Sequence, residues 1–208
     1  MKQAFAVIAV AAVVGLIAGS VLYVRMQRAD DPFAECRGGQ VAGGDIGGPF
    51  TLVDDTGATV TERDVITGPT LVYFGFTFCP DVCPTDAARN ADAVDILAKG
   101  GTPAKAVFIS VDPARDTPEA LRDFTDNLHP DMIGLTGTDA QVKAASDAYR
   151  TFYKVRNPDD EYYLVDHTTL TYLMQPGNDG TPTFLDFFKS DASPQDVAAR
   201  VACYAAAG

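Results

Sequence analysis

The chain has 208 residues, of which 47% are hydrophobic and 21% charged, and its formal net charge is −12. These proportions are typical of a globular protein with its own core rather than of a disordered or repetitive chain. The excess of acidic residues argues against nucleic-acid binding, which depends on a basic surface. We therefore expect a single folded domain and no nucleic-acid partner.

The first segment of the chain is apolar. Residues 4–24 contain no charged side chain, and as a helix they would be roughly 30 Å long, about the thickness of the hydrocarbon core of a bilayer. This run exceeds the apolar region of a typical signal peptide, which has about 7–15 residues. It predicts that residues 1–28 form one retained transmembrane helix.

The orientation of this anchor does not follow from the flanking charges, because Lys2 precedes the apolar run while Arg25 and Arg28 follow it. The chain contains four cysteines, and an even number suits an oxidising compartment. We therefore expect a single-pass protein of the cytoplasmic membrane with its domain on the periplasmic side.

Residues 29–48 are rich in glycine and charge, which predicts a flexible linker that carries a domain of residues 49–208 away from the membrane. This domain begins with a hairpin pattern at residues 49–61, with its turn at 54–57. Two apolar runs, TLVYFGF at 70–76, which contains no charged residue, and KAVFISV at 105–111, predict buried central strands.

The remaining segments alternate between helical and strand patterns. A helix is expected at 86–99, ended by two glycines, and another after the capping residue Thr117, with Pro118 in its first turn. The other expected elements are a strand at 132–137, a helix at 139–150, antiparallel strands at 162–174 and 183–188, and a closing helix from residue 193. An early buried strand that leads through a cysteine pair into a helix predicts an α/β, thioredoxin-like fold with an N-terminal β-hairpin.

The cysteine pair lies in the stretch FTFCPDVCP, where Cys79 and Cys83 are each followed by proline. Backbone N–H groups at a helix N-terminus stabilise thiolates, so we expect lowered thiol pKa values and reactive cysteines rather than inert packing. The spacing C-x-x-x-C is compatible with a disulfide and also resembles an i, i+4 pair that binds one metal ion. Two thiolates suit Cu(I), Zn(II) or iron–sulfur, but each of these sites needs further ligands.

Two histidines are available as further ligands. His129 lies in a loop between elements and is expected to be a surface residue. His167 lies between two predicted strands, in the loop that in thioredoxin-like folds approaches the strand–helix turn of the cysteines. His167 is therefore the better candidate.

Three segments together carry a resemblance to a known family: FGFTFCPDVCP at 74–84, VDPARDTPE at 111–119 and DHTTLTYLMQPG at 166–177. The chain resembles the SCO/SenC family of membrane-anchored copper chaperones from about residue 49 to the last helix. The resemblance implies that Cys79, Cys83 and His167 hold one copper ion. It also implies delivery of copper to the copper A centre on subunit II of cytochrome c oxidase. Thiolates hold Cu(I), while imidazole also suits Cu(II).

Several neighbouring residues are assigned smaller roles. Asp81 is expected to be a solvated acid of the turn, and Met174 to pack in the core of a strand rather than bind metal. Asp112, Arg115 and Asp116 follow the second buried strand and are expected to form a loop ion pair or a partner surface. The two other cysteines, Cys36 and Cys203, are expected to form a disulfide, with free thiols or an intermolecular bond as alternatives.

A second function uses the same thiols. Cys79 and Cys83 would be the redox pair of a thiol–disulfide oxidoreductase that keeps the cysteines of a target protein reduced. His167 would then be dispensable, so its presence favours copper delivery, which is binding rather than turnover. A sensor of copper or redox state would use the same residues, and a peroxidase is a weaker third hypothesis because the two cysteines lie so close together.

Overall fold

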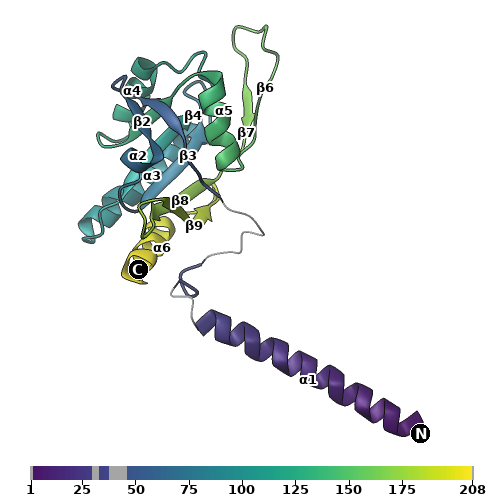
Figure 1. Ribbon diagram of the computed structural model, residues 1–208. Helices are drawn as coiled ribbons and strands as arrows, with labels where there is room; N and C mark the ends of the chain where they lie inside the picture. The colour runs from purple at the N-terminus through teal and green to yellow at the C-terminus, as the bar shows by residue number, and fades with distance from the viewer. Residues whose placement is uncertain (1, 30–32, 38–45, 208) are drawn as a thin grey trace.

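The computed structural model describes residues 2–29, 33–37 and 46–207 (Figure 1). The helices are α1 (Lys2–Ala29), α2 (Glu62–Val65), α3 (Val82–Lys99), α4 (Pro118–Asp126), α5 (Asp139–Ala148) and α6 (Pro194–Ala207). The strands are β1 (Thr51–Asp54), β2 (Thr59–Thr61), β3 (Thr70–Gly75), β4 (Lys105–Ser110), β5 (Ile133–Thr136), β6 (Tyr153–Val155), β7 (Val165–His167), β8 (Thr171–Pro176) and β9 (Pro182–Phe188).

Seven of these strands form one mixed sheet in the order β2-β1-β5-β4-β3-β8-β9, and β6 pairs with β7 in a separate two-stranded ladder. β3 runs parallel to β4 and antiparallel to β8. β3 is buried along its whole length, as its uncharged sequence predicts for a central strand. The predicted hairpin is confirmed as β1 and β2, with Leu52 opposite Val60.

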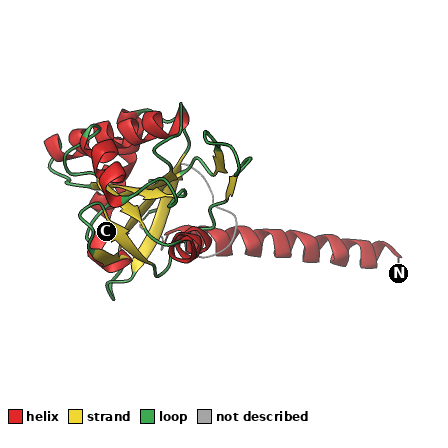
Figure 2. Cartoon of the chain, turned by 90° about the horizontal axis from the view of Figure 1, so that it is seen from above, coloured by secondary structure: helices red, strands yellow, loops and turns green. Residues whose placement is uncertain are grey.

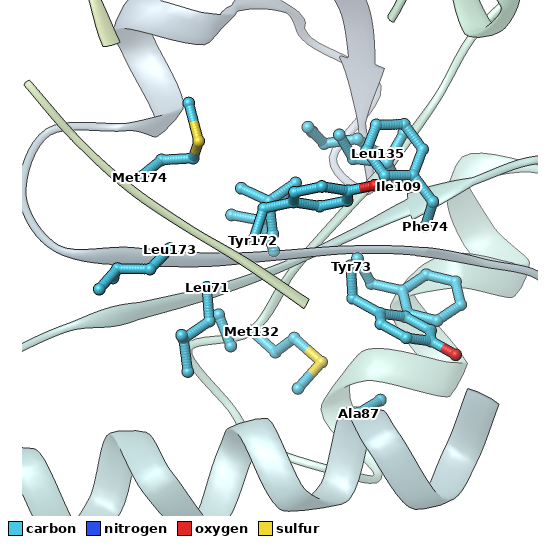
Figure 3. Packing of buried hydrophobic residues seen from close by; sticks show 14 of the residues in the cluster. Leu71, Tyr73, Phe74, Ala87, Ile109, Met132, Leu135, Tyr172, Leu173 and Met174 are labelled. Carbon is cyan, nitrogen blue, oxygen red and sulfur yellow. The ribbon is translucent and has the colours of Figure 1, made fainter. Parts of the chain in front are cut away.

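Helices cover both faces of the sheet (Figures 1 and 2). The strand period of two places Leu71 and Tyr73 on the face that α3 covers, where Ala87 also lies (Figure 3). Phe74 points to the opposite face, where its ring lies 5.2 Å from that of Tyr149, the C-cap residue that follows α5. The sheet is thus the middle layer of a three-layer α/β domain, and the cysteine turn begins where its most buried strand ends.

Several boundaries differ from the prediction. α3 begins at Val82, four residues before the predicted start at Asp86, because Pro84 falls in the first turn of the helix, where a missing N–H costs nothing. The short elements α2 and β6 were not predicted. The cap on α4 is confirmed, since the side chain of Thr117 accepts a hydrogen bond from the backbone N–H of Ala120 at 3.2 Å.

The N-terminal segment begins with α1. In the part of the chain that the structure describes, we find no helix with both the length and the apolar composition needed to cross a membrane. The anchor at residues 1–28 therefore stays a prediction. Much of the predicted linker at 29–48 lies outside the described residues, which omit 30–32 and 38–45.

The expected disulfide is confirmed. Cys36 and Cys203 are bonded, with their Cα atoms 5.6 Å apart. Next to this bond the ring of Phe33 lies 5.3 Å from that of Tyr204, and the Cys36 side chain is buried. This short segment before the domain is thereby fixed to α6.

Candidate metal centre

The two free cysteines lie in the turn between β3 and α3. The backbone N–H of Cys79 donates to the carbonyl of Phe76 at 3.2 Å, which closes the turn. Cys83 lies in the first helical turn of α3, and its backbone N–H donates to Sγ of Cys79 at 3.3 Å. The orphan N–H groups of a helix N-terminus favour negative charge at such a place, and here one of them points at the first sulfur of the pair.

His167 is the last residue of β7 and brings an imidazole to the same place. Its Nδ1 lies 3.0 Å from the backbone carbonyl of Thr168. Because a carbonyl can only accept, Nδ1 carries the proton in the neutral ring and Nε2 keeps its lone pair. Nε2 lies 3.2 Å from Sγ of Cys83, so the ring is already oriented as a metal ligand requires.

Two aromatic rings fix the plane of this imidazole. The ring centroids of Tyr73 and Phe76 lie 6.2 Å and 5.8 Å from that of His167, each with an interplanar angle of 89°. Both aromatic side chains are buried. Edge-to-face pairs of this kind are favourable and leave the imidazole little freedom to turn.

The sulfurs of Cys79 and Cys83 and a ring nitrogen of His167 all lie within 4.8 Å of one another, so the three residues could hold one metal ion. Two thiolates and one imidazole form a soft donor set, which suits copper or zinc and does not suit magnesium or calcium. The structure thus brings together the three residues that the sequence predicts as a site.

Burial dominates the electrostatics of this cluster. Burial raises the pKa of the Cys83 thiol well above its ordinary value, and the neighbouring Cys79 side chain acts in the same direction. The expectation of a lowered pKa is therefore wrong for Cys83. Burying the thiolate costs more free energy of hydration than its interaction with the helix N-terminus supplies. Burial also lowers the pKa of His167, although hydrogen bonds to the carbonyls of Thr168 and Phe74 oppose this shift. The imidazole is thus neutral at pH 7, as metal binding requires.

A small pocket gives access to the site. Its volume is about 230 Å³, and its lining includes Cys79, His167, Phe76, Pro80 and Leu164. Cys83 is fully buried, whereas Cys79 retains 8% of its exposure. An incoming ion or partner side chain therefore reaches Cys79 and His167 first, and the buried Cys83 lies deeper in the protein than these two residues.

The turn before Cys79 is held by a buried carboxylate. Asp116 accepts hydrogen bonds from the backbone N–H of Thr77 at 3.1 Å, from the Thr77 hydroxyl at 2.6 Å and from the Ser110 hydroxyl at 2.6 Å. Burial raises the pKa of Asp116, while the bonds from Ser110 and Thr77 act in the opposite direction. Asp116 thus fastens the start of the cysteine turn to the end of β4.

The predicted ion pair of the same loop is also present. Nε of Arg115 lies 2.5 Å from Oδ2 of Asp112, and Asp112 accepts a hydrogen bond from the Tyr163 hydroxyl at 2.7 Å. The guanidinium carbon lies 3.6 Å from the ring centroid of Tyr163 and 4.7 Å from that of the exposed Phe78. Arg115 therefore forms part of one wall beside the cysteine turn.

The other candidates lie outside the three-residue cluster. Asp81 is exposed at the N-terminus of α3. His129 lies away from the site, with Nε2 3.4 Å from a carboxylate oxygen of Asp95, but only 14% of its side chain is exposed, so the expectation of a surface residue is wrong. Met174 is fully buried in the core of β8 (Figure 3), so the core assignment is confirmed. Sequence reasoning missed Tyr73 and Asp86, although Asp86 follows Cys83 by three residues, a helical spacing that signals a shared face.

Comparison with known proteins identifies the family of the chain. A family model described as SCO1/SenC matches residues 39–206. The chain belongs to the SCO1/SenC family. It is 54% identical to Protein SenC of Rhodobacter capsulatus over 200 residues, which is 96% of this chain and 89% of that relative.

Solved structures of the family have the same fold. Copper-bound ScoI of Arabidopsis thaliana is 37% identical, with a TM-score of 0.71 over 77% of this chain and 99% of that one. Copper-bound ScoI of Bradyrhizobium japonicum is 38% identical, with a TM-score of 0.67 over 76% of this chain and 99% of that one. The predicted family and the thioredoxin-like α/β fold are therefore confirmed.

Proposed function

We propose that this protein is a copper chaperone that binds one copper ion through Cys79, Cys83 and His167. The observation that carries the proposal is the cluster of two sulfurs and one imidazole nitrogen within 4.8 Å, in a family whose plant and bacterial relatives have structures with copper bound. The two thiolates suit Cu(I), and the neutral imidazole allows Cu(II) to be held in the same place.

The access to the site supports delivery rather than storage. Cys79 and His167 line the pocket while Cys83 lies beneath them. A thiolate of an acceptor protein that enters this pocket can add to the copper ion before the ligands of the chaperone leave, so the ion need never be free in solution. A site with all three ligands enclosed would not permit this exchange.

The acceptor that we propose is the copper A centre on subunit II of cytochrome c oxidase. The support is the family resemblance of the three segments that carry the cysteine pair, Asp112 and Asp116, and His167. A copper A centre is built from thiolate and imidazole ligands, which belong to the same donor class as the proposed chaperone site.

We also propose that the domain is tethered to the outer face of the cytoplasmic membrane by residues 1–28. The uncharged run at residues 4–24 supports this tether. Large apolar side chains between residues 13 and 24 are exposed on α1, among them Leu16 at 72% and Leu22 at 61%. The disulfide between Cys36 and Cys203 suits the oxidising compartment on that side.

A specific observation also favours thiol–disulfide exchange as a second function. The backbone N–H of Cys83 donates to Sγ of Cys79, and Cys79 lines the pocket. Cys79 would therefore attack the disulfide of a target protein to form a mixed disulfide, and Cys83 would displace the target's thiolate. The products would be a reduced target protein and a Cys79–Cys83 disulfide.

The test is a competition titration of the reduced full-length chain against chelators, done separately for Cu(I) and Cu(II). His167→Ala is expected to lose Cu(II) affinity by more than the roughly 10–100-fold that is typical for removal of an outer hydrogen-bond partner, and to retain more of its Cu(I) affinity. His129→Ala, the matched control, should bind as the parent does. Equal and weak binding by parent and His167→Ala, together with rapid disulfide exchange, would replace the chaperone with the oxidoreductase.

A further inference from the structure

We propose that the buried pair of Asp86 and Arg89 positions His167 over the cysteine helix and thereby sets the preference of the site for Cu(II) relative to Cu(I). The inference rests on the copper-binding function proposed above. Neither residue is among the three ligands. Both lie on α3, the helix whose first turn contains Cys83.

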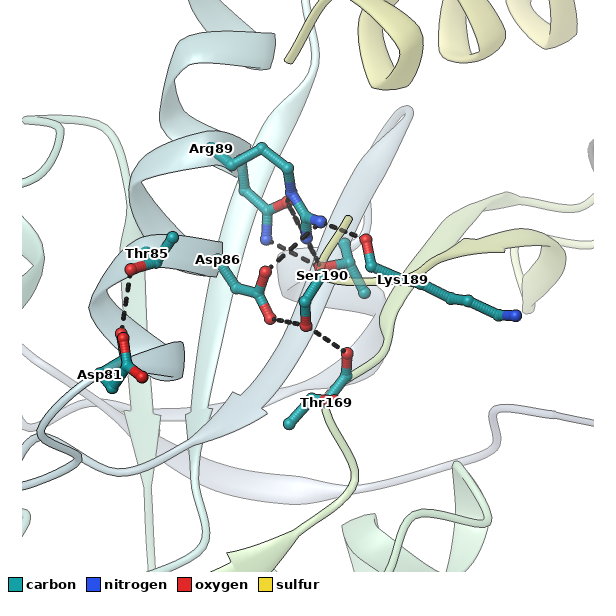
Figure 4. Close-up of polar contacts among 9 residues, drawn as sticks. Asp81, Thr85, Asp86, Arg89, Thr169, Lys189 and Ser190 are labelled. Carbon is teal, nitrogen blue, oxygen red and sulfur yellow. Dashed lines mark hydrogen bonds and ion pairs between the residues drawn. The ribbon is translucent and has the colours of Figure 1, made fainter. Parts of the chain in front are cut away.

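The guanidinium of Arg89 is buried, with 6% of its side chain exposed. It donates to the backbone carbonyl of Lys189 at 2.6 Å and to the hydroxyl of Thr171 at 2.7 Å (Figure 4). Its Nη1 also lies 3.4 Å from a carboxylate oxygen of Asp86. Arg89 thus joins α3 to the first residue of β8 and to the loop after β9.

Asp86 is 1% exposed and completes the connection from the other side. It accepts a hydrogen bond from the Ser190 hydroxyl at 2.7 Å, and that hydroxyl lies 3.4 Å from the backbone carbonyl of Thr169 (Figure 4). The second carboxylate oxygen is buried and accepts no hydrogen bond. Its negative charge is balanced by Arg89, so the two residues act as one unit.

These contacts involve the short segment that follows His167. Thr169 and Thr171 are two and four residues beyond it. The backbone N–H of Thr168 donates to the carbonyl of Phe152 at 2.9 Å, and among the described strands β7 pairs with the three-residue β6 alone. The β6–β7 ladder thus holds the chain up to His167. The hydrogen bonds of Asp86 and Arg89 on α3 hold the residues that follow it.

The geometry distinguishes a positioning role from simple stabilisation. Replacing both members of a buried ion pair by apolar or neutral groups is often close to neutral for stability. A dithiol holds Cu(I) without help, whereas Cu(II) depends on the imidazole nitrogen. Releasing the segment around His167 should therefore weaken Cu(II) binding selectively and leave the two sulfurs in place.

The experiment uses the full-length reduced chain and competition titrations with Cu(I) and Cu(II). The test variant is Asp86→Asn combined with Arg89→Met, which removes both charges together. We expect Cu(II) affinity to fall by about 10–100-fold, as for outer partners of other metal ligands, and Cu(I) affinity to change by less than about threefold. A tenfold loss of Cu(II) affinity relative to Cu(I) affinity corresponds to a rise of about 59 mV in the Cu(II)/Cu(I) reduction potential of the bound ion.

The matched control is a partly buried ion pair that joins α6 to β9, Arg200 with Asp186 at 3.5 Å. Arg200→Met combined with Asp186→Asn should leave both copper affinities unchanged. If the test variant does not fold, as judged by its circular dichroism melting curve, Ser190→Ala replaces it. Ser190→Ala removes only the hydroxyl between Asp86 and Thr169, and a smaller loss of Cu(II) affinity alone is then expected.

Equal losses for both copper ions, or no loss for either, would overturn the inference. The same titrations separate its failure from failure of the proposed function. If His167→Ala loses Cu(II) affinity and the network variants do not, only the positioning role is wrong. If His167→Ala binds Cu(II) as the parent does, the ligand set itself is wrong.

Discussion

Removing the disulfide between Cys36 and Cys203 should cost the protein a large part of its stability. The two cysteines are 167 residues apart in the sequence, so the bond closes a loop that contains almost the whole domain. In the chain-entropy description a loop of this length restricts the unfolded chain by about 5 kcal/mol at 25 °C. We expect the variant with both Cys36→Ala and Cys203→Ala to lose a stabilisation of this order.

The assay is urea unfolding of the metal-free, full-length protein, followed by circular dichroism. Because the uncrosslinked chain expands further when it unfolds, the dependence of the unfolding free energy on urea should also become steeper in the double variant. The parent treated with a thiol reductant should match the double variant. A loss of less than about 1 kcal/mol would show that the unfolded chain is compact without the bond, and would refute the entropic argument.

Three further changes test the fold and the site. Phe74→Ala should destabilise the domain by about 3–5 kcal/mol in urea unfolding, because this fully buried ring packs against Tyr149 and Tyr172. Thr117→Ala should cost about 1 kcal/mol by the same assay, since it removes the cap of α4. Burial lowers the pKa of His167 below its ordinary 6.5, so the unfolded chain takes up a proton first as the pH falls. The stabilisation that neutral His167 contributes is therefore complete above pH 6.5. It is lost as the pH falls from 6.5 to the lower pKa of the folded protein. His167→Gln should remove this component of the metal-free stability curve, and an unchanged curve would contradict the assignment.

The main strands and helices were predictable because each has a strong local pattern. β3 and β4 are largely apolar runs that contain β-branched and aromatic residues, and α4 begins at a Thr-Pro cap. The elements that were missed, α2 with four residues and β6 with three, are too short for any period to show. β6 exists because β7 pairs with it, which no local pattern encodes.

The three residues that cluster at the candidate site were predictable from the sequence, but the residues that support them were not. The C-x-x-x-C motif and the Asp-His-Thr-Thr segment name Cys79, Cys83 and His167 from the sequence. The support from Ser190 joins residues that are 104 positions apart in the chain, and Arg89 donates to a backbone carbonyl, which any residue at position 189 would supply. Contacts of this kind depend on the finished fold.

The raised pKa of Cys83 helps to separate the two proposed functions. A thiol that keeps its proton at pH 7 is a poor nucleophile, and Cys83 is also fully buried. In disulfide exchange it would therefore act only after Cys79 had attacked, and resolution of the mixed disulfide would be slow near neutral pH. Metal binding has no such requirement, because the ion displaces the proton as it binds. The same burial that slows exchange also shields a bound ion from water and leaves only Cys79 and His167 open to the pocket. This arrangement suits a site that holds copper until a partner protein supplies ligands of its own.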